Sequence, residues 1–185
     1  MTFDDLVAYS LVMEDAVCAW LRRKGWLVLP TRDLGGPDSG AYVQLPEGGR
    51  LILPDILAFT DTTSVWVEVK RKQGPSWATA PLDGGKPGWV TGLNSRHLLD
   101  YGRVAHRTGI PVMVLWLHDK GCCDRDSSTE PGAGRVYGWQ VTPMDGENEG
   151  ARMAEWQGVY VRGSMTYFRL SALVSYGLTD DLARR

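Results

Sequence analysis

The chain has 185 residues, of which 43% are hydrophobic and 23% are charged, and its formal net charge is −2. This composition excludes a disordered or fibrous chain, and the length suits one compact domain with a sizeable core. No apolar run reaches the ~20 residues that span a bilayer, and three cysteines fit no disulfide framework, so we expect a cytoplasmic protein without a membrane partner.

The first elements of the chain are predicted to be a helix and a strand. Apolar residues at spacings of three and four predict a helix over residues 3–24, and Gly25 is suited to end it. The run WLVLP at 26–30 predicts a strand. Residues 32–50 are rich in glycine, proline and aspartate, which predicts a loop or a weakly paired hairpin.

A β-hairpin is predicted over residues 51–72. LILPDILAFT and VWVEVKRK flank the polar turn 61–64. Counting from this turn places Asp55 opposite Lys70, and directly opposed residues point to the same face of a sheet. By the two-residue period of a strand, Glu68 shares that face. The other face is apolar and carries Ile56, Ala58, Val65, Val67 and Val69.

The middle of the chain alternates irregular and regular patterns. Residues 73–92 show no periodicity and contain many glycines and prolines, which is typical of a functional or disordered loop. Residues 93–108 predict an amphipathic helix that ends at Gly109. The apolar run 112–117 predicts a strand covered on both faces, and 136–141 predicts the next strand.

The last part of the chain is predicted to add a hairpin and a helix. Residues 158–161 and 166–170 are predicted to form the hairpin, and Ser171 is suited to cap a helix that runs to about Leu182. The whole order predicts a mixed α/β sheet flanked by helices, with extra strands and a helix at the C-terminal end.

Two carboxylates and an ammonium group on one sheet face suggest a metal site. Asp55 and Glu68 would lie on a diagonal with Cα atoms roughly 7–8 Å apart, so both would reach one cation. Mg²⁺ prefers oxygen ligands and is commonly bound by one or two carboxylates together with substrate phosphates. Lys70 would then orient water or neutralise charge on the phosphate. The alternative is a structural salt bridge, which contributes little on a half-exposed face.

This pattern resembles the signature of a nuclease family. Pro54-Asp55, twelve intervening residues and Glu68-Val69-Lys70 resemble the motif of the PD-(D/E)xK, or restriction-endonuclease-like, superfamily. Glu14 on the first predicted helix resembles the helix glutamate of many members, including small Holliday-junction resolvases. The resemblance covers about residues 10–118 and implies an αβββαβ core within a single domain of residues 1–185.

The resemblance also implies roles for individual residues. Asp55, Glu68 and Lys70 would be catalytic, with Glu14 as an outer ligand or water organiser. Mg²⁺ would be held by Asp55, Glu68, Glu14 and the carbonyl of Val69, and Mn²⁺ would substitute for it.

Basic residues gather in separate clusters, although the net charge is close to zero. Such a distribution lets one face meet phosphates, while an ordinary solvated surface explains each cluster equally well when it is taken alone. The predicted nucleic-acid contacts are Arg71, Lys72, Arg96, His97 and Tyr101. Trp77 and Trp89 would suit base stacking on a single strand, but we favour a role in packing their loop onto the core.

The resulting hypothesis is a nuclease that hydrolyses DNA by metal-activated water. We expect an Mg²⁺-dependent endonuclease that is structure-selective or weakly sequence-specific and acts in recombination, repair or replication. Cutting both strands of a duplex would favour a two-fold dimer. The alternative is a nucleic-acid-binding or assembly protein that retains a nuclease fold without turnover.

Overall fold

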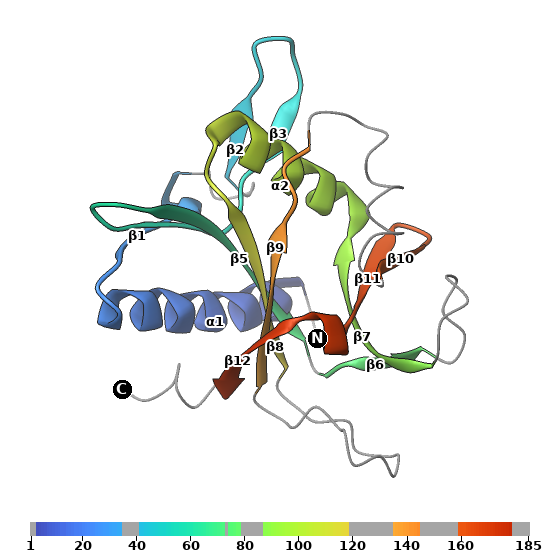
Figure 1. Ribbon diagram of the computed structural model, residues 1–185. Helices are drawn as coiled ribbons and strands as arrows, with labels where there is room; N and C mark the ends of the chain where they lie inside the picture. Colours follow the sequence, from blue (N-terminus) through green and yellow to red (C-terminus); the bar gives the residue numbers. More distant parts are fainter. Residues whose placement is uncertain are drawn as a thin grey trace.

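The structure, a computed structural model, describes residues 3–34, 41–72, 74–78, 87–118, 135–144 and 159–178. A six-stranded mixed sheet lies between helices α1 (Phe3–Arg23) and α2 (Ser95–Thr108) (Figure 1). In spatial order the sheet consists of β1 (Leu27–Pro30), β4 (Ile56–Phe59), β5 (Ser64–Lys72), β8 (Val112–His118), β9 (Arg135–Val141) and β12 (Val174–Leu178). Among the described residues, no helix is long and apolar enough to cross a membrane.

Two smaller sheets and two short 3-10 turns complete the described part. One small sheet consists, in spatial order, of β10 (Val159–Arg162), β11 (Met165–Arg169), β7 (Gly88–Asn94) and β6 (Ser76–Ala78). The hairpin of β2 (Tyr42–Gln44) and β3 (Arg50–Ile52) projects beyond α2 at the top of Figure 1. The 3-10 turns are η1 (Thr31–Leu34) and η2 (Leu170–Ala172).

The elements follow the predicted order along the chain. The two helices and the first four strands of the central sheet run α1, β1, β4, β5, α2, β8, which is helix, three strands, helix, strand. Strand β5 pairs antiparallel with β4 and parallel with β8, so the sheet is mixed. The prediction of a mixed α/β sheet flanked by helices is therefore confirmed.

Local sequence signals explain both helices. Gly25 ends α1 with a φ of 86°, and the N–H of Trp26 donates to the carbonyl of Leu21 at 3.1 Å. Asn94 caps α2, because its side chain accepts a hydrogen bond from the N–H of Arg96 at 2.9 Å. Gly109 ends that helix with a φ of 67°. The two glycines end the helices as predicted, and the Asn94 cap starts α2 two residues later than the predicted residue 93.

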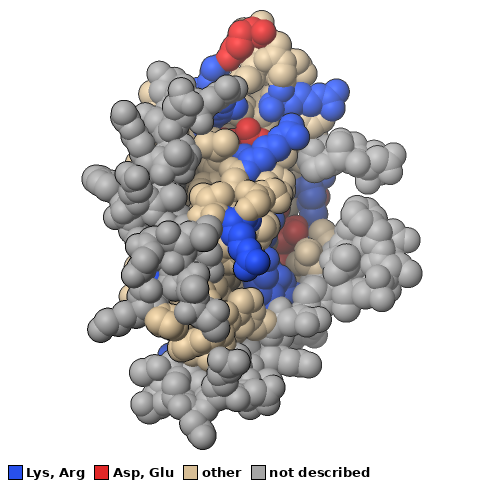
Figure 2. All heavy atoms as spheres, turned by 90° about the vertical axis from the view of Figure 1, so that its right-hand side faces the viewer, with Lys and Arg blue, Asp and Glu red and all other residues tan. Residues whose placement is uncertain are grey.

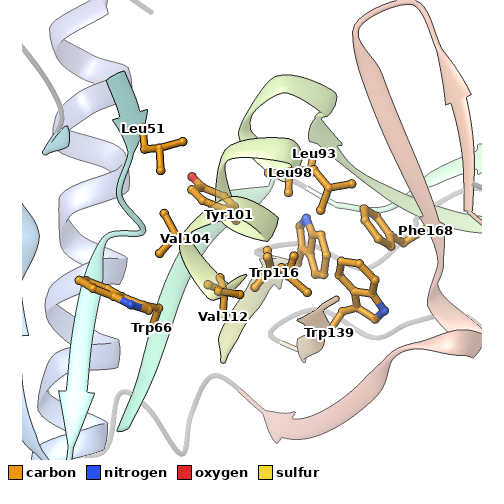
Figure 3. Close-up of a cluster of buried hydrophobic side chains, with 13 residues drawn as sticks. Leu51, Trp66, Leu93, Leu98, Tyr101, Val104, Val112, Trp116, Trp139 and Phe168 are labelled. Atoms are coloured by element: carbon orange, nitrogen blue, oxygen red, sulfur yellow. The ribbon is translucent and has the colours of Figure 1, made fainter. Parts of the chain in front are cut away.

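Each face of the sheet has its own core. On the α1 side, Val17 and Leu21 pack on the apolar face of the hairpin, and Val67 and Val69 are buried there as predicted. On the α2 side, aromatic rings fill the space between the central sheet and β11 (Figure 3). The cluster drawn there includes Trp66, Leu98, Tyr101, Trp116, Trp139 and Phe168. Trp66 and Glu68, on the α2 face of β5, are therefore buried, while Lys70 on the same face stays partly exposed.

The predicted register of the central hairpin is wrong by two residues. The structure pairs Ile56 with Val67, which would bring Asp55 to the level of Glu68 and not of Lys70. The reason lies in the turn, where the Thr60 hydroxyl accepts hydrogen bonds from the N–H groups of residues 62 and 63 and shifts the loop by one residue. A shift of two residues keeps every side chain on its predicted face.

The first strand of that hairpin is also shorter than predicted. Residues 50–52 belong to β3 and pair with β2, and β4 begins only at Ile56. Pro54 lies between them and has no N–H to donate to a ladder, which explains the break. Residues 32–50 therefore supply η1 and a paired hairpin, as one of the two predicted alternatives states.

Two further predictions are wrong. The described part of the expected loop 73–92 forms β6 and most of β7, where Trp77 pairs with Trp89 and their ring centroids lie 4.8 Å apart. The expected helix from Ser171 is instead the turn η2 followed by β12, and residues beyond 178 lie outside the described part. The β-branched and aromatic side chains of this segment favour pairing with the edge of β9.

Gly138 makes the packing of this last strand possible. A Cβ at Gly138 would overlap the ring of Tyr176 and approach Leu115 Cδ2 to 3.0 Å. We expect Gly138→Ala to lower the free energy of unfolding by about 1–3 kcal/mol, because overpacking displaces side chains. Urea denaturation measures the change.

Gly88→Ala is the matched control. Its Cβ would meet only Arg169 Nη1, at an ordinary 3.5 Å, so we expect a change within about 0.5 kcal/mol. Equal destabilisation by both substitutions would contradict the packing role of Gly138.

Candidate active site

Asp55 is held at the edge of the central hairpin by hydrogen bonds to both its backbone and its side chain. Its carboxylate Oδ2 accepts from the N–H of Val69 at 2.8 Å. Thr31 fixes the backbone, since its N–H donates to the carbonyl of Asp55 and its hydroxyl donates to the carbonyl of Pro54, each at 2.8 Å. Thr31 is 2% exposed. The turn η1 therefore determines where the Asp55 carboxylate lies.

Glu68 is a buried carboxylate that is only partly satisfied by hydrogen bonds. It is 1% exposed and forms an ion pair with Lys70, whose side chain is 28% exposed. The hydroxyl of Tyr101 donates a hydrogen bond to Glu68. The oxygen Oε2 of Glu68 has no hydrogen-bond partner among the described residues. Burying a carboxylate oxygen without a hydrogen-bond partner costs free energy, so we expect a cation or another ligand to bind at this atom.

The charges of the site influence one another strongly. Burial raises the pKa of Asp55 well above its usual range, and the negative charge of Glu68 raises it further, while Lys70 lowers it. Burial acts to lower the pKa of Lys70, but the charges of Glu68 and Asp55 outweigh this effect and raise it. Two carboxylates thus share one ammonium group, and a bound cation would relieve the excess of negative charge.

The donor set fits a magnesium ion with few protein ligands. Among the described residues, no three His, Cys, Asp or Glu side chains come together as a metal-binding group. Asp55 and Glu68 provide two carboxylates, and one or two carboxylates with waters and substrate phosphate are the usual ligands of Mg²⁺. The residues therefore fit a cation that keeps most of its water, but not a fully protein-enclosed metal.

Glu14 lies near these groups but is engaged by another residue. Its side chain is 14% exposed, and its Oε2 lies 3.6 Å from Nη1 of Arg32 on η1. Burial raises the pKa of Glu14, Arg32 lowers it, and the charges of Glu68 and Lys70 also act on it. Glu14 is thus within electrostatic reach of the site, and its predicted role as an outer ligand would require it to exchange partners.

Helix α2 covers the site with His97 and Tyr101. Tyr101 is 1% exposed and bonded to Glu68, so its position does not suit the predicted contact with nucleic acid. Its role is to hold the carboxylate. His97 is half-buried, and its Nδ1 is buried without a hydrogen-bond partner among the described residues. Burial and the positive charge of Lys70 lower the pKa of His97.

The remaining predicted contacts lie at different depths around the site. Arg96 is exposed, whereas Arg71 and Lys72 are half-buried, and burial lowers the pKa of both. On the face that Figure 2 presents, Lys and Arg side chains gather around a recessed acidic patch. This arrangement is compatible with phosphate binding near a carboxylate site.

Sequence reasoning missed three residues that shape the site. Thr31 and Arg32 act from η1, a turn whose position follows from tertiary contacts and not from a local motif. Asp100 lies on the predicted amphipathic helix and is a charged residue, but it is 5% exposed and accepts a hydrogen bond from the backbone of Ile52. The sequence around Asp100 shows only a regular helical period, and this pattern does not reveal that β3 covers the side of α2 on which Asp100 lies.

Comparison with known proteins identifies a structural similarity and no sequence relative. No family model and no curated protein matches the chain. Among solved structures, the chain is similar to Hjc, a Holliday junction resolvase from the archaeal hyperthermophile Archaeoglobus fulgidus. The two chains are 15% identical, the match covers 86% of this chain and 87% of that one, and the TM-score is 0.47.

The Thr31 hydroxyl is expected to stabilise the site segment. Thr31→Val would leave the buried carbonyl of Pro54 without its donor, and we expect the free energy of unfolding to fall by about 1–3 kcal/mol. Thr31→Ser keeps the hydroxyl and should lose only about 0.8 kcal/mol for the missing methyl group. Chemical denaturation of both variants measures the difference. A serine variant as unstable as the valine variant would contradict this role.

The burial of His118, at the end of β8, leads us to expect a specific pH dependence of the free energy of unfolding. It is fully buried with Nε2 3.3 Å from Thr91 Oγ1, and burial lowers its pKa to about 4. The unfolded chain binds this proton near pH 6.5, so stability falls as the pH drops from 6.5 towards 4, by about 3 kcal/mol in full.

The variant His118→Gln should remove this part of the acid sensitivity. The difference in unfolding free energy between pH 7 and pH 4.5 should be smaller than in the native chain, as measured by urea denaturation at both pH values. His106→Gln, at an exposed position on α2, is the control and should leave the difference unchanged. If the change in unfolding free energy between pH 7 and pH 4.5 is the same in His118→Gln as in the native chain, His118 does not cause this pH dependence.

Proposed function

We propose that the chain is a divalent-metal-dependent nuclease that hydrolyses DNA phosphodiester bonds. The observation that carries the proposal is the buried Glu68, with one oxygen paired to Lys70 and the other without a partner, beside the carboxylate of Asp55. A structural salt bridge would need neither the second carboxylate nor an unpartnered oxygen. A cation that binds phosphate accounts for both.

Asp55 and Glu68 are the residues that would hold the metal, with the carbonyl of Val69 and Glu14 as further candidates. When bound, Mg²⁺ or Mn²⁺ supplies activation of a water molecule and neutralisation of charge on the phosphate. Endonuclease action on DNA, with structure-selective or weak sequence preference, is part of the proposal. The whole chain would act as a single domain.

Lys70 acts as a cation in this proposal. The negative charges of Glu68 and Asp55 raise its pKa above the usual range of a lysine, which favours the protonated form. The ammonium group is held by Glu68 and is aimed at the same face as Asp55, where it would stabilise negative charge that develops on the phosphate. Tyr101 and the N–H of Val69 keep the two carboxylates in place.

The test is cleavage of labelled single-stranded, duplex, flap and four-way-junction DNA with Mg²⁺, Mn²⁺ or EDTA. We expect metal-dependent cutting that Asp55→Asn reduces roughly 100-fold or more, since even an outer-shell partner of a metal ligand is worth 10–100-fold. Asparagine still accepts the Val69 hydrogen bond, so folding is preserved, and thermal unfolding checks this.

Asp61→Asn is the matched control, because Asp61 is exposed in the turn between β4 and β5. It should cut like the native protein. Equal activity of Asp55→Asn and the native chain would refute the assignment of the site. Binding of DNA without any cleavage would favour the alternative function, a nucleic-acid-binding or assembly protein without turnover.

A further inference from the structure

Three arginines form a straight stripe on the outer side of α2. Arg96, Arg103 and Arg107 are separated by seven and four residues, and at 100° per residue they fall within an arc of about 40°. Arg96 and Arg107 are exposed, and the side chain of Arg103 is 29% exposed. Because α2 is capped at both ends and packed on the core, the stripe has a fixed geometry.

The stripe and the candidate active site lie on different sides of α2. His97 and Tyr101 lie about 100° and about 140° around the helix from Arg96. They face Glu68 and Lys70, as their electrostatic influence on one another indicates.

Asp100 lies next to the stripe, about 20° beyond Arg107, but its carboxylate is buried and engaged by the backbone of Ile52. The stripe therefore presents three positive charges, of which Arg107 is paired with the exposed carboxylate of Glu47 on the β2–β3 hairpin. Phosphate would replace Glu47 as the partner of Arg107.

We propose that Arg96, Arg103 and Arg107 bind the backbone of double-stranded DNA beside the bond to be cut, an inference that rests on the proposed function. The stripe is about 16 Å long, at 1.5 Å per residue, which corresponds to about five base pairs at 3.4 Å each. A rigid row of charges suits the regular phosphates of a duplex better than the variable backbone of a single strand.

The tryptophans support a duplex as well, and the exposed aromatic rings in the described part include the tyrosines Tyr42, which Arg50 covers, and Tyr176. Proteins that bind single strands stack bases on accessible aromatic rings. Each tryptophan in the described part of the chain is buried or half-buried, and Trp77 packs edge-on against Trp89 within a core cluster. The packing role that we favoured for this pair is the one the structure gives them. No tryptophan among the described residues thus offers a stacking platform.

The test is the salt dependence of binding to a labelled 20-base-pair duplex and to a single strand of equal length. Ca²⁺ replaces Mg²⁺, since it takes similar oxygen ligands. Each phosphate that is neutralised contributes about 0.9 to the slope of log Kd against log salt concentration. Replacing all three arginines with glutamine should reduce the duplex slope by about 2.7, and Arg96→Gln with Arg107→Gln by about 1.8.

The controls separate charge from structure. Lysine at all three positions should retain the slope, and Arg22→Gln, at the exposed end of α1, should leave it unchanged. The double variant leaves Arg103 beside Asp100, so it tests the stripe even if the triple variant is unstable.

The outcomes for the inference and for the function are distinct. If the chain cuts DNA but the slope of log Kd against log salt concentration is unchanged after the arginines are replaced, the proposed role of the arginines is overturned. The proposed nuclease function is then unaffected. Tighter binding of the single strand than of the duplex would also overturn the proposed role of the arginines. A native chain that neither cuts nor binds any DNA would refute the proposed function, and the inference with it.

Discussion

The burial of Glu68 is the constraint on which the rest of the site depends. A charged carboxylate at 1% exposure is strongly unfavourable unless charged and hydrogen-bonding groups surround it. Lys70 supplies the charge from the same strand, two residues on, and Tyr101 supplies a hydroxyl from α2. A chain selected only for stability would replace such a cluster with apolar residues of similar volume. The presence of a second acid, Asp55, beside it is the feature that the proposed metal site explains.

The break in the strand before β4 allows the side chain of Asp55 to take a hydrogen-bonding position in the sheet beside β5. The ladder between β4 and β5 ends at Ile56 and Val67, because Pro54 cannot extend it. The N–H of Val69 would lack an acceptor beyond that point, and the carboxylate of Asp55 takes the place of a main-chain carbonyl. The same hydrogen bond that completes the sheet therefore aims Asp55 at the site.

The two-residue period predicted the faces of the hairpin correctly, even though the register was wrong, because an even shift leaves each side chain on its face. The C-terminal helix ends followed equally well from Gly25 and Gly109, whereas the Asn94 cap places the start of α2 at Ser95, two residues after the predicted start. The partners that hold the site did not follow from the sequence. Thr31 meets Pro54 across 23 positions, and only the folded chain brings them together. The strand β12 likewise depends on a free edge of β9, which no local pattern records.

In the proposed function, one helix would link the chemistry of the site to the binding of its substrate. The inner side of α2 holds Glu68 through Tyr101 and packs against the aromatic cluster around Trp116 and Phe168, whose ring centroids lie 5.0 Å apart. Its outer side carries the arginine stripe. Groups on one rigid element keep their relative positions more precisely than groups on separate loops. In this proposal, the distance between the bound DNA backbone and the carboxylates is set by the diameter of α2 and the packing beneath it. A change in the aromatic cluster would then displace the arginine stripe and the Tyr101 hydroxyl together.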